Sequence, residues 1–153
     1  MALFTGIVDG LQYSDTVEQV FPEGLTYSSD CSPCGVLDSP YIIKSTSSNT
    51  SANYDISYID TGLLTVNKFD LIVKANDAEI TYGQLEQPDF GITVNPEILP
   101  YDEAIADVLG DLSFTPSDGC TNNTTININQ SVQPDNYNIT YESGALTINK
   151  TDL

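Results

Sequence analysis

The sequence has no histidine and no tryptophan, and its four basic residues are all lysines. Histidine is the commonest general base and metal ligand near neutral pH, so its absence removes the usual centre of acid–base and metal chemistry. No glycine-rich phosphate loop is present, and no serine or threonine stands in a recognisable pattern with a base. We therefore expect no enzymatic activity and name no catalytic residue.

Basic residues are equally scarce. The chain has 22 acidic residues and 4 lysines, which give a net charge of −18. Nucleic acids and anionic membrane surfaces need a basic face on their partner, so both are excluded. No apolar run is long enough to span a bilayer, and we expect no membrane insertion. The many carboxylates could bind calcium, but no EF-hand spacing is present, and we expect no cofactor.

Only three cysteines occur, and two of them, Cys31 and Cys34, form a CxxC pair. A redox CxxC normally stands at the start of a helix, whereas here Gly35 and Pro40 follow and predict a loop and then a strand. A zinc site would need two further ligands, and only Cys120 remains. The pair is therefore predicted to be a local disulfide or two free thiols.

What the sequence does contain is an internal repeat. The stretch "NYDISYIDTGLLTVNKFDL" (53–71) returns at the end of the chain as "NYNITYESGALTINKTDL" (136–153), and the stretch 13–31 resembles 101–120. Such similarity predicts repeated structural units of about 80 residues. Identical pairs mark the predicted joint between units: Asn67/Asn149, Lys68/Lys150 and Asp70/Asp152.

The repeat divides the chain into three parts. Residues 1–68 form a unit that lacks its first strands, residues 69–150 form a complete unit, and residues 151–153 begin a further one. No secretory signal is visible at residues 1–4, and this phase predicts a segment excised from a longer array. The alternative is that the open edge of the first unit receives a strand from a neighbouring chain, which would build a fibre.

Within the complete unit, apolar alternation predicts strands at 71–75, 79–83, 90–94, 112–114, 124–130, 136–141 and 144–149. The stretch 102–110 is the helix candidate, because Ile105, Val108 and Leu109 follow helical spacing before Gly110. Residues 14–24 repeat this helix in the first unit. A short turn at 142–144 predicts that the last two strands form a hairpin.

This order of elements predicts a chain that is mostly β with one short helix per unit. It favours tandem small β-grasp-like domains. Immunoglobulin-like β-sandwiches are the alternative, although a sandwich gives the helix no natural place. The matched tyrosines alternate along their strands, which favours core packing over sugar binding: Tyr54, Tyr58, Tyr137 and Tyr141.

The stretches "ANDAEITYGQ" and "NYNITYESGALTI" together resemble the MBG domain of the YGX type, with Tyr82, Gly83 and Gln84 as the YGX signature. The resemblance covers Asp70 to Lys150, and it covers residues 1–68 apart from the missing YGX strand. It implies a β-grasp-like module that is repeated in bacterial surface proteins and adhesins. It implies no catalytic residue and no defined ligand site.

From this resemblance we expect a spacer or stalk repeat of a large secreted adhesin at the bacterial cell surface, which projects a distal binding region. Its partners would be neighbouring repeats of the same polypeptide. Two alternatives stay open: the repeat itself binds glycans or surfaces, or it exchanges strands with copies of itself to form a fibre.

Overall fold

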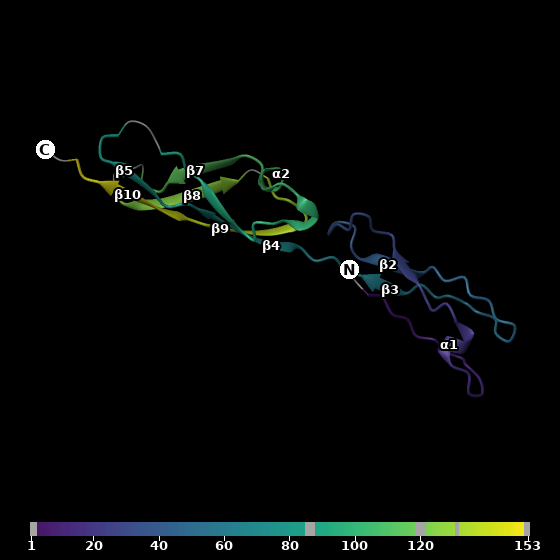
Figure 1. Cartoon of the computed structure of the whole chain (residues 1–153). Helices are drawn as coiled ribbons and strands as arrows, with labels where there is room; N and C mark the ends of the chain where they lie inside the picture. Colours follow the sequence, from purple (N-terminus) through teal and green to yellow (C-terminus); the bar gives the residue numbers. More distant parts are fainter. Residues whose placement is uncertain (1–2, 85–87, 119–121, 131, 152–153) are drawn as a thin grey trace. The chain divides into compact units, whose positions relative to one another are not determined.

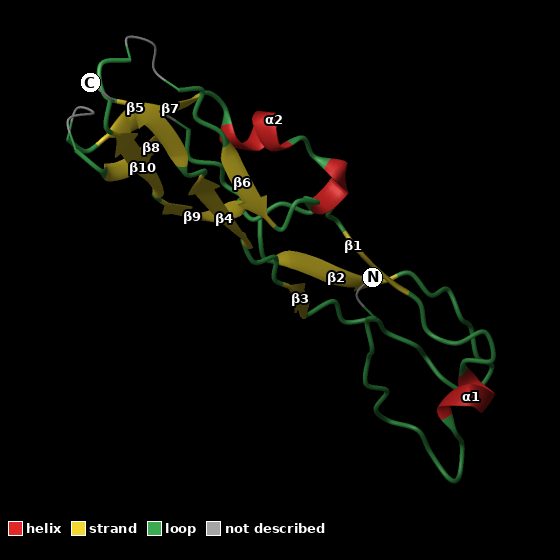
Figure 2. Cartoon of the chain, turned by 60° about the vertical axis from the view of Figure 1, so that its left-hand side comes forward, coloured by secondary structure: helices red, strands yellow, loops and turns green. Residues whose placement is uncertain are grey.

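The computed structural model describes residues 3–84, 88–118, 122–130 and 132–151. The chain folds into two compact units, Met1–Asn67 (unit 1) and Lys68–Leu153 (unit 2), and Figure 1 labels most of their elements. The prediction of a mostly β chain with few short helices is confirmed (Figure 2). Within the described ranges, no helix has the length and apolar character needed to cross a membrane.

Unit 2 contains a three-stranded sheet of order β6-β4-β9 and a four-stranded sheet of order β5-β10-β8-β7. Its strands follow the alternating apolar pattern of the sequence, as in β4, where Leu71, Val73 and Ala75 are buried and the residues between them are exposed. The elements are β4 (Phe69–Ala75), β5 (Ala78–Thr81), β6 (Ile92–Asn95), the 3₁₀ helix η1 (Pro100–Asp102), α2 (Ile105–Leu109), β7 (Leu112–Pro116), β8 (Thr124–Gln130), β9 (Tyr137–Glu142) and β10 (Gly144–Asn149).

Two long bent strands run through both sheets and join them. β4 continues into β5 after residues 76–77, and β9 continues into β10 after Ser143 alone. Each half of the first strand lies parallel to the matching half of the last strand, with Val73 opposite Tyr141 and Ile80 opposite Ile148. Taken as one bent sheet, the order is β6, β4–β5, β9–β10, β8, β7. The first and last strands are thus parallel neighbours, as a β-grasp arrangement requires, and the bend divides the strands between two sheets.

The predicted hairpin between the last two strands is wrong. β9 pairs with β4, whereas β10 pairs with β5 and β8. A single intervening residue, Ser143, is too short for a tight hairpin loop, so the chain continues forward. Gly144 permits the bend, because a Cβ atom there would lie 2.6 Å from the carbonyl oxygens of Ala75 and Asn76.

The core of unit 2 lies in two clusters of buried side chains. Helix α2 contributes Val108 and Leu109 to one of these clusters. The helix is shorter than the predicted 102–110, because Tyr101 and Asp102 have left-handed φ angles of 59° and 56°. One cluster contains Leu71, Val73, Val94, Leu99, Val108, Leu109 and Tyr137, and the other contains Ala75, Ile80, Ile126 and Leu146.

Unit 1 contains helix α1 (Val17–Val20) and one antiparallel sheet of β1 (Tyr27–Ser29), β2 (Tyr41–Ser45) and β3 (Gly62–Leu64). Its sheet has the register of β7, β8 and β10, since Ile43 lies opposite Gly62 as Ile126 lies opposite Gly144. The helix is shorter than the predicted 14–24, with Pro22 two residues beyond its end.

No counterpart of the three-stranded sheet forms within residues 3–67. Its central strand would be the equivalent of β4, and the sequence of unit 1 contains no such stretch. Without the central strand, the two outer strands have nothing to pair with. Val20 and Phe21 are accordingly the only buried hydrophobic residues among the described part of unit 1.

Candidate functional site

The YGX motif directly follows β5 and contacts the end of β10. Gly83 has a φ of +88°, which favours glycine, and the Gln84 side chain accepts a hydrogen bond from the Thr81 backbone at 3.3 Å. The Tyr82 backbone N–H donates to the Asn149 carbonyl at 2.8 Å, and its carbonyl accepts from the Thr151 hydroxyl at 2.6 Å. The motif is therefore a turn whose first residue fastens the end of β10.

The start of β4 is likewise held by contacts with the start of β9. The Phe69 N–H donates to the Asn136 carbonyl at 2.8 Å, and the Phe69 ring meets the Tyr137 ring edge-on at 5.9 Å. Asp70, predicted as a joint residue, accepts a hydrogen bond from the Asn138 side chain at 2.9 Å. Both ends of unit 2 are thus held by contacts between its first and last strands.

The other predicted joint residues lie on the surface. Asn67, Lys68 and Lys150 are exposed, and Asp152 lies outside the described residues. Residues 65–68 belong to no strand, so an irregular stretch separates β3 from β4. Asp70 accepts from Asn138 and the Asn149 carbonyl accepts from Tyr82, so neither hydrogen bond joins one joint residue to another.

Cys31 and Cys34 are joined in a disulfide, and the loop that follows it is fixed by Tyr41. The Tyr41 hydroxyl donates to the Gly35 carbonyl at 2.9 Å and accepts from the Gly35 N–H at 3.0 Å. This bridge closes a four-residue loop beside the sheet of unit 1. Its contacts are those of a structural element.

One of the two pairs of matched tyrosines, Tyr54 and Tyr137, makes the same polar contact in both units. The Tyr137 hydroxyl donates to Glu103, and the Tyr54 hydroxyl donates to Asp15. Burial, followed by this hydrogen bond, raises the pKa of Tyr137 to about 12. Burial also raises the pKa of Tyr141. Tyr137 and Tyr141 pack in or against the core of unit 2, as the alternation predicted, whereas Tyr58 of unit 1 is exposed, so the prediction is wrong there.

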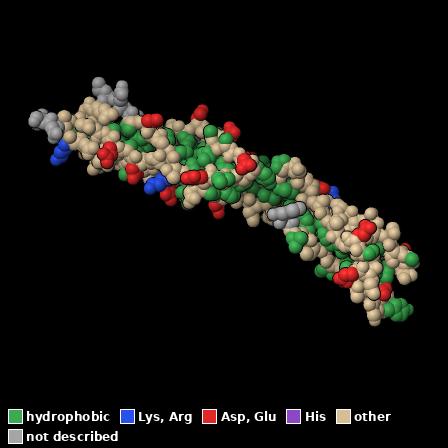
Figure 3. All heavy atoms as spheres, in the orientation of Figure 1, with side chains coloured by type: hydrophobic (Ala, Val, Ile, Leu, Met, Phe, Trp, Pro, Cys, Tyr) green, Lys and Arg blue, Asp and Glu red, His purple; other side chains and the backbone are tan. Residues whose placement is uncertain are grey.

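Acidic side chains do not converge on a metal site in the part of the chain that the structure describes. On the face shown in Figure 3, red carboxylates are scattered over the surface and are not gathered in one patch. Asp30 forms a 2.7 Å ion pair with Lys44 and raises the pKa of that lysine. The charge therefore acts as a diffuse negative field.

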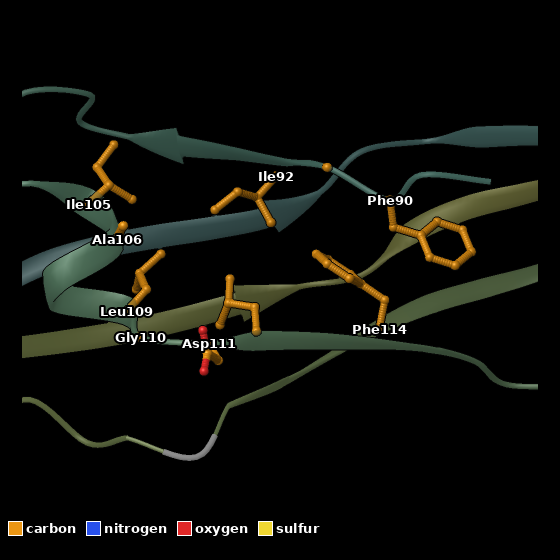
Figure 4. A pocket seen from close by; sticks show the side chains of 10 residues that line it. Phe90, Ile92, Ile105, Ala106, Leu109, Gly110, Asp111 and Phe114 are labelled. Atoms are coloured by element: carbon orange, nitrogen blue, oxygen red, sulfur yellow. The ribbon is translucent and has the colours of Figure 1, made fainter. Parts of the chain in front are cut away.

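Unit 2 carries an open apolar groove of about 470 Å³ between the edge strands β6 and β7. Figure 4 shows Phe90 and Phe114 at one end, Ile92 near the middle, and Ile105 and Leu109 of α2 at the other. The two phenylalanine rings lie 5.8 Å apart. Asp111 is the one charged residue of its lining, so the groove lacks the convergent polar groups of a specific small-molecule site.

Unit 1 carries a larger groove of about 600 Å³, lined by two extended segments, 5–11 and 54–62. Neither segment belongs to a strand, apart from Gly62 at the start of β3. The floor includes Val20, Phe21 and Ile43. Sequence reasoning foresaw an open edge in this unit but did not locate the groove.

The family comparison adds a finding about unit 2. Residues 71–147, just over half of the chain, match the family described as the MBG domain (YGX type). No curated protein and no solved structure matches the chain.

Proposed function

The chain belongs to the MBG domain (YGX type) family, which is typical of bacterial surface proteins, and from this premise we propose that it is a load-bearing spacer of a secreted adhesin. In this role it stands at the cell surface and projects a distal binding region. Its partners are neighbouring repeats of the same polypeptide. It is not an enzyme and takes no cofactor.

The observation that carries the proposal is the parallel pairing of the first and last strands of unit 2. β4 pairs with β9 through six residue pairs, and β5 pairs with β10 through four. Force applied to the two ends of unit 2 pulls β4 backward and β10 forward. The hydrogen bonds of the β4–β9 and β5–β10 pairs are then loaded together, along the strand direction, and do not open one after another. The contacts at Phe69 and Tyr82 lie where the load enters and leaves.

Net charge supports the same role. A charge of −18 keeps neighbouring copies apart in solution and, on a crowded surface, separates adjacent stalks. This repulsion weakens as salt shortens the screening length. A stalk of such units is extended by its own charge as well as by its folded modules.

Single-molecule pulling of the full chain tests the proposal. Attachment at Lys68 and Thr151 loads the parallel strands in shear. Attachment at Lys68 and Glu97 is the matched control, because β4 and β6 are antiparallel and both attachment points then lie at the same end of that pair. We expect a clearly higher unfolding force for the first geometry, and equal forces would refute the load-bearing role.

A second candidate, glycan binding, is favoured by one observation. Tyr13 and Tyr101 occupy matched positions, are exposed at 104% and 70%, and share a left-handed φ of 59°. Such backbone conformations are uncommon outside glycine and often mark functional positions. Glycan-array binding that is lost in the Tyr13→Ala, Tyr101→Ala double variant would support this role.

A further inference from the structure

We propose that the groove of unit 1 is an acceptor site for one extended β-strand of the β4 type that is not already paired within a folded unit. The strand would lie parallel to residues 54–59 and antiparallel to residues 5–11. This interaction surface does not depend on the load-bearing role proposed above.

The first argument is what fills the equivalent place in unit 2. There β4 lies between β6, to which it is antiparallel, and β9, to which it is parallel. The groove of unit 1 lies between the counterparts of these same two strands. Tyr54, Ile56 and Tyr58 line it, and they correspond to Tyr137, Ile139 and Tyr141, the β9 residues that pack with the core around Leu71 and Val73.

Apolar residues at the end of helix α1 line the groove as their counterparts in α2 pack against β4. Val20 and Phe21 line the groove, and their counterparts Val108 and Leu109 pack in one cluster with the β4 side chains. Ile7, at the position of Ile92, is 90% exposed in unit 1, whereas Ile92 packs against that cluster in unit 2. Unit 1 therefore retains an apolar surface for a strand that it does not contain.

The backbone of the groove is also available for pairing. Within the described residues, segments 5–11 and 54–61 make no backbone-to-backbone hydrogen bond. Unpaired extended backbone is a template for strand addition. Gly62 lines the groove at the position of Gly144, and Gly144 is the residue that lets the bent strand approach in unit 2. In unit 1 the nearest atoms that a Cβ at Gly62 would meet belong to the Ile43 side chain, the first of them at 3.2 Å.

The acidic residues of the groove restrict which residues a bound strand can carry opposite them. Asp9, Asp55 and Asp60 line the groove, and its lining contains no lysine. Asp55 stands at the position of Asn138, which in unit 2 donates a hydrogen bond to Asp70. A strand that carries Asp at this position would place two carboxylates together. The preferred occupant therefore has apolar residues at alternate positions, as Leu71, Val73 and Ala75 are placed in β4, and a hydrogen-bond donor or a cation opposite Asp55.

A second copy's own β4 is a poor source of this strand. Leu71 and Val73 are exposed by only 1% and 0% in unit 2, so donating β4 would dismantle the core of the donor. A strand that is not already paired carries no such cost. We therefore assign the groove to a free β4-type strand.

The test uses the full chain and synthetic peptides of residues 68–82. Binding is followed by hydrogen exchange of residues 5–11 and 54–60 and by fluorescence anisotropy of a labelled peptide. We expect the Asp70→Asn peptide to protect both segments and to bind at least about threefold more tightly than the unaltered peptide, because like charges on directly opposed strand positions repel. A Val73→Asp peptide, which breaks the apolar face, should not bind.

The chain variant Asp55→Asn provides the reciprocal measurement. It is a surface change outside the hydrophobic core, and it should remove the preference for the Asp70→Asn peptide over the unaltered one. The proposal is overturned if no peptide protects residues 54–60, or if the Val73→Asp peptide binds as well as the others. Concentration-dependent dimers that protect residues 54–60 without peptide would identify a second copy as the occupant and overturn the assigned source. None of these outcomes depends on the pulling experiment.

Discussion

The substitution Gly144→Ala tests the role assigned to the bend between the two sheets of unit 2. An added Cβ would lie 2.6 Å from two carbonyl oxygens, those of Ala75 and Asn76. Ordinary carbon–oxygen contacts begin near 3.3 Å, so the backbones must separate by about 0.7 Å. The atoms met belong to the backbone and cannot rotate away. We therefore expect a loss at the upper end of the range for overpacking, about 3 kcal/mol of the free energy of unfolding.

Hydrogen exchange of the full chain measures this loss in unit 2 separately from unit 1. A destabilisation of about 3 kcal/mol corresponds to about a hundredfold faster exchange for the amides that open only with the whole unit. The slowest amides should be those of β4 and β9, because β4 is the central strand of its sheet.

Gly62→Ala is the matched control for this prediction. The three atoms nearest to the added Cβ would all belong to the Ile43 side chain, the first of them at 3.2 Å. We expect a cost below about 1 kcal/mol, confined to unit 1, because a side chain can adjust by a few tenths of an ångström. A Gly144→Ala chain that exchanges within threefold of the wild type would refute the assignment of the bend to this glycine. A Gly62→Ala change that costs more than Gly144→Ala would refute it as well.

Three further outcomes can be measured on the same protein. The folded-state pKa of Tyr137 is about 12, above the ordinary value of 10. The free energy of unfolding that this shift contributes is therefore fully present below pH 10 and is lost as the pH rises towards 12. Stability should fall less steeply with alkaline pH in the Tyr137→Phe variant than in the wild type. A chelator should leave the melting temperature unchanged, and a fall of several degrees would reveal a calcium site. Reduction of the Cys31–Cys34 disulfide removes a link that closes only a short loop. Hydrogen exchange should therefore become faster around residues 30–41 and stay unchanged in unit 2.

Individual strands were predictable because their side chains alternate. β8 and β10 occupy the predicted ranges 124–130 and 144–149, and β4 begins two residues before the predicted one. Alternation reports which face of a strand is buried but carries no information about its neighbour. That is why the pairing of β9 and β10 was predicted wrongly, although both strands were placed. The signal for the bend was present in the sequence as the identical pair Gly62 and Gly144, whose meaning depends on a contact with residues 75 and 76.

The helices and the site were less accessible to sequence reasoning. Left-handed backbone at Tyr101 and Asp102 shortens α2. Aspartate tolerates this conformation better than most residues, but a tyrosine does not indicate it. The Tyr82, Gly83 and Gln84 motif was found as a family signature, whereas its contact with the Asn149 carbonyl requires the parallel register of β5 and β10. Register between distant strands is set by packing of the whole unit.

The two units show what a strand needs beyond its own sequence. Tyr54 to Tyr58 repeats the alternation of Tyr137 to Tyr141, and only the second stretch forms a strand. The difference is the presence of β4, which offers β9 a partner for six residue pairs and a surface for its apolar side chains. Because an isolated extended segment gains neither, strand propensity by itself does not build the sheet. Unit 1 thus retains the side chains of a two-sheet module while forming one sheet, and the groove is the physical consequence of that single missing strand.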